Sequence, residues 1–148
     1  MQEAVALARL AAAEGEVPVG AVVVFDGKVI ARGRNAREHT QDLAAHAELI
    51  AMREAAQVLG SWRLTGCTVY VTLEPCPMCA GAIVQSRTSA CVFGASDPKG
   101  GFFGTLADLS AFPGLNHQVT VRAGVEEETC AALLTDFFRG LRRASRRS

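Results

Sequence analysis

The alternation of β-rich runs with helical patterns is the feature that most restricts how this chain can fold. Residues 19–25 and 28–33 are apolar, β-branched runs joined by Asp26-Gly27, a dipeptide that accepts the positive φ angles of a two-residue hairpin turn. Three further β-rich runs alternate with helical patterns, at residues 67–73, 90–94 and 118–123. Strands separated by helices favour right-handed crossovers and parallel pairing. We therefore expect a three-layer α/β domain: a five-stranded mixed sheet with helices on both faces.

Apolar residues at helical spacing predict the helices that cover this sheet. We expect them at residues 2–14, 44–59, 76–85 and 126–143, with a short helical piece at 106–109. Gly15 and Gly60 end the first two. A chain of 148 residues fits one hydrophobic core, so we predict a single domain over residues 1–148.

A formal net charge of zero conceals an uneven distribution. Residues 139–148 hold five arginines and no acidic residue, so the other 138 residues hold 10 basic and 15 acidic side chains. A body with this excess repels polyanions on average, so any nucleic-acid contact must be local. The basic end, 142–148, is either a phosphate-contacting segment or a solvated, flexible terminus.

Five cysteines in a chain without a recognisable export signal are typical of reduced thiols and of a cytoplasmic protein. The first helical stretch carries Glu3 and Arg9 and is too short and too polar at its start to direct export or to cross a membrane. No apolar run elsewhere reaches membrane length. Cys67, Cys91 and Cys130 fall in predicted strands and a predicted helix, where core packing explains them.

The two remaining cysteines, Cys76 and Cys79, lie three residues apart at the start of a predicted helix, with Pro77 in its first turn. Unpaired N–H groups and the helix dipole favour thiolates there, so the pair could hold a cation. A thioredoxin-like redox dithiol and a pair of packed apolar side chains are the alternatives. A third ligand would decide between them.

His46 and Glu48, at the start of the preceding predicted helix, complete such a site. If both helices open at one sheet edge, His46, Cys76 and Cys79 fill three tetrahedral positions of Zn²⁺ and leave one to water, as in catalytic sites. Glu48 would then be the general acid/base. Residues two apart on a helix point in nearly opposite directions, so His46 must lie at the mouth of its helix.

Each of these residues also has an ordinary explanation. A lone histidine such as His46 is commonly a core or surface residue, and Glu48 could be a first-turn acid that complements the helix dipole. His39 and His117 fall in predicted loops and are weaker ligand candidates than His46. The coincidence of all four residue types at two helix starts favours the metal site.

The order His-x-Glu followed by Pro-Cys-x-x-Cys is typical of zinc deaminases that act on nucleobases. Segments along most of the chain resemble the bacterial tRNA-specific adenosine deaminases: residues 16–22 (EVPVGAV), 46–48 (HAE), 72–82 (TLEPCPMCAGA) and 136–139 (DFFR). The resemblance implies a cytidine-deaminase-like fold, a homodimer, and conversion of adenosine to inosine at the wobble position of a tRNA anticodon loop. It also puts one Zn²⁺ per subunit on His46, Cys76 and Cys79 and the proton shuttle on Glu48.

The same resemblance suggests contacts to the flipped nucleoside and its neighbours. Asn35 would hydrogen-bond the nucleoside, and Asp97 and Lys99 would hold the neighbouring nucleotides. A turn residue is the plain alternative for Asn35, and a loop initiator for Asp97. Further residues expected to line the base pocket or to meet phosphates are Val17, Leu73, Ala95, Arg37 and Arg139.

Two other functions compete with this one. A deaminase of a free base or nucleoside, such as guanine or cytosine, would use the same zinc chemistry in a different pocket, but residues 136–139 and the arginines after them favour a polynucleotide. A non-enzymatic, zinc-stabilised RNA-binding module would need a fourth Cys or His and would have no use for Glu48.

Overall fold

A mixed five-stranded sheet forms the centre of the structure, a computed structural model that describes residues 1–147. β1 pairs antiparallel with β2 and β3, whereas β3, β4 and β5 run parallel. The sheet order is β2-β1-β3-β4-β5, with β1 Gly20–Phe25, β2 Lys28–Arg34, β3 Cys67–Leu73, β4 Ala90–Ala95 and β5 Thr120–Arg122. The expected mixed sheet is confirmed.

The β1–β2 hairpin forms for the local reason that the sequence predicts. Asp26 and Gly27 both have positive φ, 52° and 74°, as a two-residue turn with the twist of the flanking strands requires. The register shifts between Val23 and Val24, and a bulge of this kind increases the local twist.

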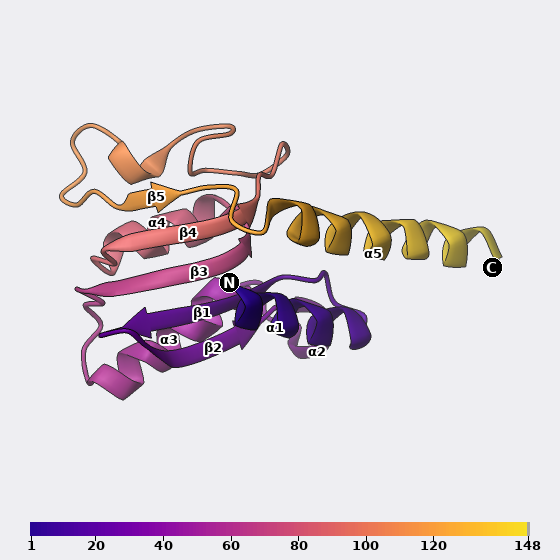
Figure 1. The fold of residues 1–148 in the computed structure, drawn as a ribbon, viewed down its shortest axis with the longest axis horizontal. Helices are drawn as coiled ribbons and strands as arrows, with labels where there is room; N and C mark the ends of the chain where they lie inside the picture. Colours follow the sequence, from indigo (N-terminus) through magenta and orange to yellow (C-terminus); the bar gives the residue numbers. More distant parts are fainter. Residues whose placement is uncertain (148) are drawn as a thin grey trace.

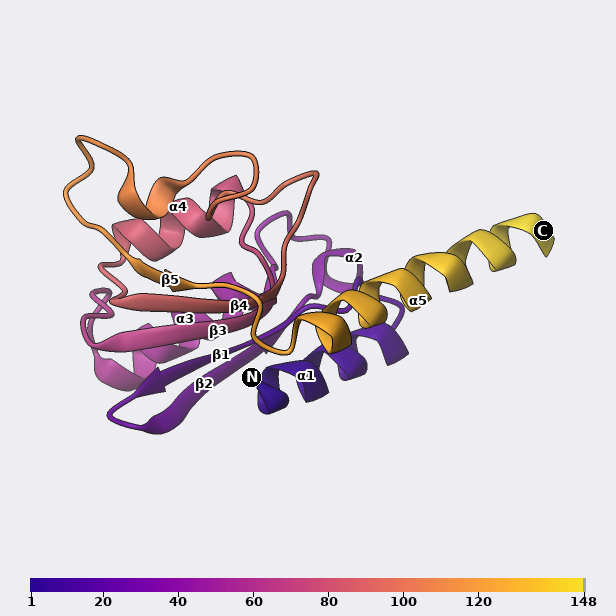
Figure 2. The same ribbon diagram turned by 45° about the horizontal axis from the view of Figure 1, so that its top comes forward.

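Helices cover both faces of the sheet. Figure 2 shows α1 and α5 on one side and α4 on the other, and α3 packs on β1 and β2 from that second side. Their bounds are α1 Gln2–Ala13, α2 Arg37–Thr40, α3 Ala47–Leu59, α4 Pro77–Gln85 and α5 Glu127–Arg147, with a 3-10 turn at Leu109–Ala111. The three-layer arrangement is thus confirmed.

Two glycines allow helices to approach the sheet closely. A methyl group on Gly20 would overlap the backbone of α1, and one on Gly33 would overlap the carbonyl of Ala47 at the start of α3. Because Gly33 lies opposite Ala21 in the ladder, the two glycines face opposite sides. The start of α3 is therefore seated directly on β2.

The three cysteines assigned to packing are buried. Cys67 and Cys91 belong to the main core between the sheet and helices α3 and α4. Cys130 lies in a smaller cluster with Val5 and Ala95 under α1 and α5. All three are free thiols, and their burial confirms the interpretation as core residues.

Several element bounds differ from the expectation. α3 begins at Ala47 instead of residue 44 because His46 has an extended backbone, with φ −80° and ψ 150°. The short helical piece lies at 109–111, where Asp108 accepts a hydrogen bond from the backbone of Ser110. The four-residue helix α2 was not expected, since a single turn shows no periodicity in the sequence.

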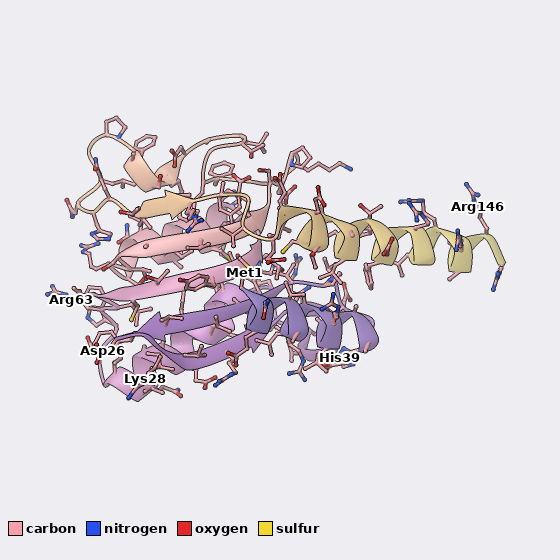
Figure 3. All side chains as sticks on the ribbon, in the orientation of Figure 1. Met1, Asp26, Lys28, His39, Arg63 and Arg146 are labelled. Carbon is pink, nitrogen blue, oxygen red and sulfur yellow. The ribbon has the colours of Figure 1, made fainter. Side chains whose placement is uncertain are left out.

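α5 continues to Arg147 instead of ending near residue 143. Its last part carries no glycine or proline after Gly140, so local propensity does not stop the helix. The helix leaves the body of the protein and projects beyond it (Figure 1), and Arg146 lies near its far end (Figure 3). Flexibility of residues 142–148 stays a prediction. Within residues 1–147, every helix is too short or too polar to cross a bilayer.

Candidate active site

Helices α3 and α4 bring His46 and Cys76 to one edge of the sheet. β2 and β3 both run antiparallel to β1, so their carboxyl ends lie at the same edge, and the segments leading into α3 and α4 leave from there. His46 is the N-cap of α3 and Cys76 the N-cap of α4, both with extended backbone. His46 therefore lies at the helix mouth, where the sequence requires it, and Glu48 lies in the first turn.

The side chains of His46, Cys76 and Cys79 converge on one point. His46 Nδ1 lies 3.5 Å from Cys76 Sγ and 3.4 Å from Cys79 Sγ. Ligands on a tetrahedral Zn²⁺, with Zn–N about 2.1 Å and Zn–S about 2.3 Å, are about 3.6 Å apart. Among the described residues, this is the one group of three or more His, Cys, Asp or Glu side chains close enough to share an ion. Both its spacing and its donor set fit Zn²⁺.

Hydrogen bonds among His46, Cys76 and Cys79 shift the pKa values of all three side chains. Hydrogen bonding from Cys79 lowers the pKa of Cys76 to about 4, against the effect of burial and with a further contribution from His46. The hydrogen bond to Cys76 raises the pKa of His46, and the same thiolate together with burial raises that of Cys79. Helix N-termini favour a thiolate here. A dication would compete with the shared protons for the same lone pairs.

A pocket opens directly beside the three side chains. Its volume is about 540 Å³ when the open mouth is included. Glu48 lines it and is 4% exposed, and burial raises the pKa of its carboxyl group. The predicted residues Val17, Asn35, Leu73 and Asp97 line it as well. Asn35 donates from Nδ2 to the carbonyl of Val17 at 3.3 Å, which orients its amide at the pocket wall.

A second, wider groove continues from this pocket toward α5. The two share Val17, Leu73 and Asp97, and Lys99 lies in the groove. The far wall comes from α5, through Leu134, Thr135, Phe138 and Arg142. The structure thus joins the pocket to a groove with cationic and aromatic side chains.

Two of the predicted residues lie elsewhere. Ala95 does not line the pocket: it is buried with Val5 and Cys130, because α1 and α5 cover that part of β4. Arg139 lines neither cavity and instead lies 3.6 Å from Asp136 on the same helix. One turn of α5 separates it from the groove-facing Arg142.

The other two histidines are engaged outside the cluster. His39 Nδ1 lies 2.9 Å from Glu16, and His117 Nε2 lies 2.7 Å from the carbonyl of Thr88. Arg37, by contrast, lines the pocket and approaches His46 Nε2 at 3.2 Å.

Two buried carboxylates beside the pocket have no counterpart in the predicted site. Glu16 accepts hydrogen bonds from the backbone of Glu38 and His39, and these bonds lower its pKa although burial opposes them. Glu74 lines the pocket and accepts bonds from residues 97, 103 and 105. In the sequence, the signal that could have indicated these buried carboxylates is an acidic residue directly beside an apolar one, in Glu16-Val17 and Leu73-Glu74.

Comparison with known proteins relates this site to deaminases. The family model of the MafB19-like deaminases matches residues 1–142. A tRNA-specific adenosine deaminase of Bacillus subtilis is 54% identical over 143 residues, which cover 97% of this chain and 89% of the relative.

Two solved structures are also similar. One comes from studies of A-to-I editing by tRNA:A34 deaminases at the wobble position; it is 43% identical with a TM-score of 0.88, over 90% of this chain and 97% of that one. A guanine deaminase of Bacillus subtilis is 44% identical with a TM-score of 0.62, over 64% of this chain and 61% of that one.

Proposed function

Since the chain belongs to the MafB19-like deaminase family, we propose that it is a tRNA adenosine deaminase that converts adenosine to inosine at the wobble position of an anticodon loop. The observation that carries the proposal is the convergence of His46, Cys76 and Cys79 at two helix N-termini, beside a pocket that also holds Glu48. Likeness over 90% of this chain to a structure from studies of A34 deaminases supports the substrate.

His46 Nδ1 and the sulfurs of Cys76 and Cys79 would hold one Zn²⁺ ion. When bound, Zn²⁺ supplies a Lewis acid that lowers the pKa of a water molecule at the position left open by three protein ligands. The two thiolates and the neutral imidazole cancel the charge of the ion, so the positive ends of α3 and α4 would contribute to the field at the reacting atoms.

Glu48 would move the protons of the reaction. Its carboxylate takes a proton as the water oxygen bonds to C6 of adenine, and returns it to the leaving amino group. The C6–N bond then breaks, the oxygen stays on C6 and ammonia leaves. Burial of Glu48 in the pocket keeps bulk water from competing for that proton.

The pocket and groove suit a nucleotide taken from a strand. An unpaired anticodon base costs least to flip out, and Asn35, held at the pocket wall by its bond to Val17, would hydrogen-bond it. In the groove, Phe138 offers a stacking surface, and Lys99 and Arg142 offer charges for neighbouring phosphates. The excess of acidic residues outside 139–148 makes these local cations necessary.

Two further properties complete the proposal. We expect a homodimer, as the resemblance to the tRNA-specific adenosine deaminases implies. We also expect a cytoplasmic location, since the substrate is a tRNA and all five cysteines are free thiols.

A free-base or nucleoside deaminase is the second candidate, favoured by the likeness to a guanine deaminase. The purified protein should be incubated with an anticodon stem-loop carrying adenosine at position 34, with free adenosine, with cytidine and with guanine. We expect ammonia and inosine from the RNA alone. Release of ammonia from a free substrate but not from the stem-loop would replace the proposal with the second candidate.

A further inference from the structure

Glu74 is a buried carboxylate that the chemistry described above does not use. It follows β3 directly and is 2% exposed. Oε1 accepts hydrogen bonds from the backbone N–H of Asp97 at 3.1 Å and from the hydroxyl of Thr105 at 2.5 Å. Oε2 accepts from the backbone N–H of Phe103 at 3.0 Å and of Thr105 at 3.1 Å. Four donors from one loop thus converge on this side chain.

The loop 97–105 is built around this carboxylate. It forms no strand ladder, and its isolated bridge joins Phe103 to Asp108. A methyl group on Gly101 would overlap the Glu74 carboxylate, so the backbone comes as close to it as a glycine allows. Hydrogen bonds to a buried charge are stronger than those between neutral groups, and removing their acceptor leaves several donors unpaired.

The same loop forms the part of the site expected to contact RNA beside the reacting base. Asp97 lines both the pocket and the groove, and Pro98 and Lys99 line the groove. Glu74 itself lines the pocket, between the helix start that bears Cys76 and the loop. The loop is thus held beside the segment that leads to Cys76 by the Glu74 carboxylate and by a hydrogen bond from the backbone N–H of Phe102 to the carbonyl of Pro75, at 2.9 Å.

We propose that Glu74 is a positioning residue, which holds the loop 97–105 as the preformed wall of the base pocket and groove. The inference rests on the proposed function. Binding would then not have to order this loop, and ordering a loop on binding reduces affinity. Loss of Glu74 would act on recognition of the RNA, whereas His46, Cys76 and Cys79 would keep their mutual distances.

The test is Glu74→Gln, which keeps the size of the side chain but turns one acceptor into a donor facing the loop amides. We expect one Zn²⁺ per chain as in the wild type, and faster amide hydrogen exchange at Asp97, Phe103 and Thr105. kcat/KM for the A34 stem-loop should fall about 10- to 100-fold, mostly through KM, as misplacement of a binding wall predicts. A loss of folded protein alone would lower the apparent kcat and leave KM unchanged.

Glu16→Gln is the matched control, because Glu16 is equally buried and also accepts backbone N–H bonds, from the segment around α2. It should leave amide exchange in 97–105 as in the wild type. If Glu74→Gln does not fold, Thr105→Val removes only the hydroxyl donor to Oε1 and should raise KM in the same direction.

Wild-type KM and wild-type exchange in these variants would overturn the proposal, as would loss of zinc with an unchanged KM. An inactive wild-type protein would refute the proposed function, and the exchange measurement would still decide whether Glu74 holds the loop.

Discussion

Replacing Glu48 with glutamine isolates proton transfer from metal binding. The side chain is 4% exposed and lines the pocket beside the three candidate ligands, but it is not one of them. A general acid/base contributes about 10²- to 10⁴-fold to rate. Because so little of Glu48 reaches solvent, bulk water cannot replace it, and we expect the upper half of that range. kcat should therefore fall about 10³- to 10⁴-fold, which corresponds to about 4 to 5.5 kcal/mol.

The assay is inosine formation in the A34 stem-loop by zinc-loaded protein, with metal content measured on the same sample. Glu48→Gln should retain one Zn²⁺ per chain, and its melting temperature should be unchanged or higher, since glutamine removes the penalty of burying a charge. Glu54→Gln, at an exposed position of the same helix, should match the wild type. More than a tenth of wild-type activity in Glu48→Gln would refute the proton-transfer role, and loss of zinc would show that Glu48 supports the metal.

Three further predictions concern the metal and the scaffold. Cys79→Ser should lose the bound zinc in a dialysis experiment, whereas Cys67→Ser, which replaces a buried core thiol, should lower the melting temperature and keep the metal; zinc retained by Cys79→Ser would contradict the ligand set. Gly33→Ala should destabilise the protein by about 1 to 3 kcal/mol, because the added methyl group overpacks against the start of α3. The control Gly140→Ala, with open space around it, should not destabilise the protein. Equal denaturation midpoints for the two variants would argue against the close contact between β2 and α3. The pKa of Glu16 is lower in the folded protein than its ordinary value of 4.5, so its carboxylate contributes fully to stability above pH 4.5, and this contribution is lost as the pH falls through the folded-state pKa. In urea denaturation, the difference in stability between the wild type and Glu16→Gln should therefore be largest near neutral pH and should narrow below about pH 4.5. A difference that grows in acid would contradict the lowered pKa.

Local signals explain why much of the architecture was predictable. Asp26-Gly27 specifies the hairpin through two positive φ angles. His46 and Cys76 cap consecutive helices, and the parallel crossover that joins β3 to β4 requires α4 to begin at the carboxyl edge of the sheet. The convergence of the candidate metal ligands follows from topology and from spacing along the chain.

Contacts between distant segments explain most of what the sequence did not show. Three of the four donors to Glu74 are backbone N–H groups 23 to 31 residues away, and backbone groups leave no pattern of side chains to read. The resemblance places Ala95 and Arg139 at the substrate, but which side of β4 or α5 they occupy depends on how α5 packs against the body. A short motif cannot specify that packing.

The coordination of a single metal ion tests the central claim most directly. X-ray absorption at the zinc edge should be measured on the full chain, purified without added chelator or excess metal. We expect one Zn²⁺ per chain with two sulfur ligands at about 2.3 Å, one imidazole nitrogen and one oxygen ligand from solvent. Absence of a stoichiometric metal, or a fourth ligand supplied by another side chain, would contradict an open catalytic site at His46, Cys76 and Cys79.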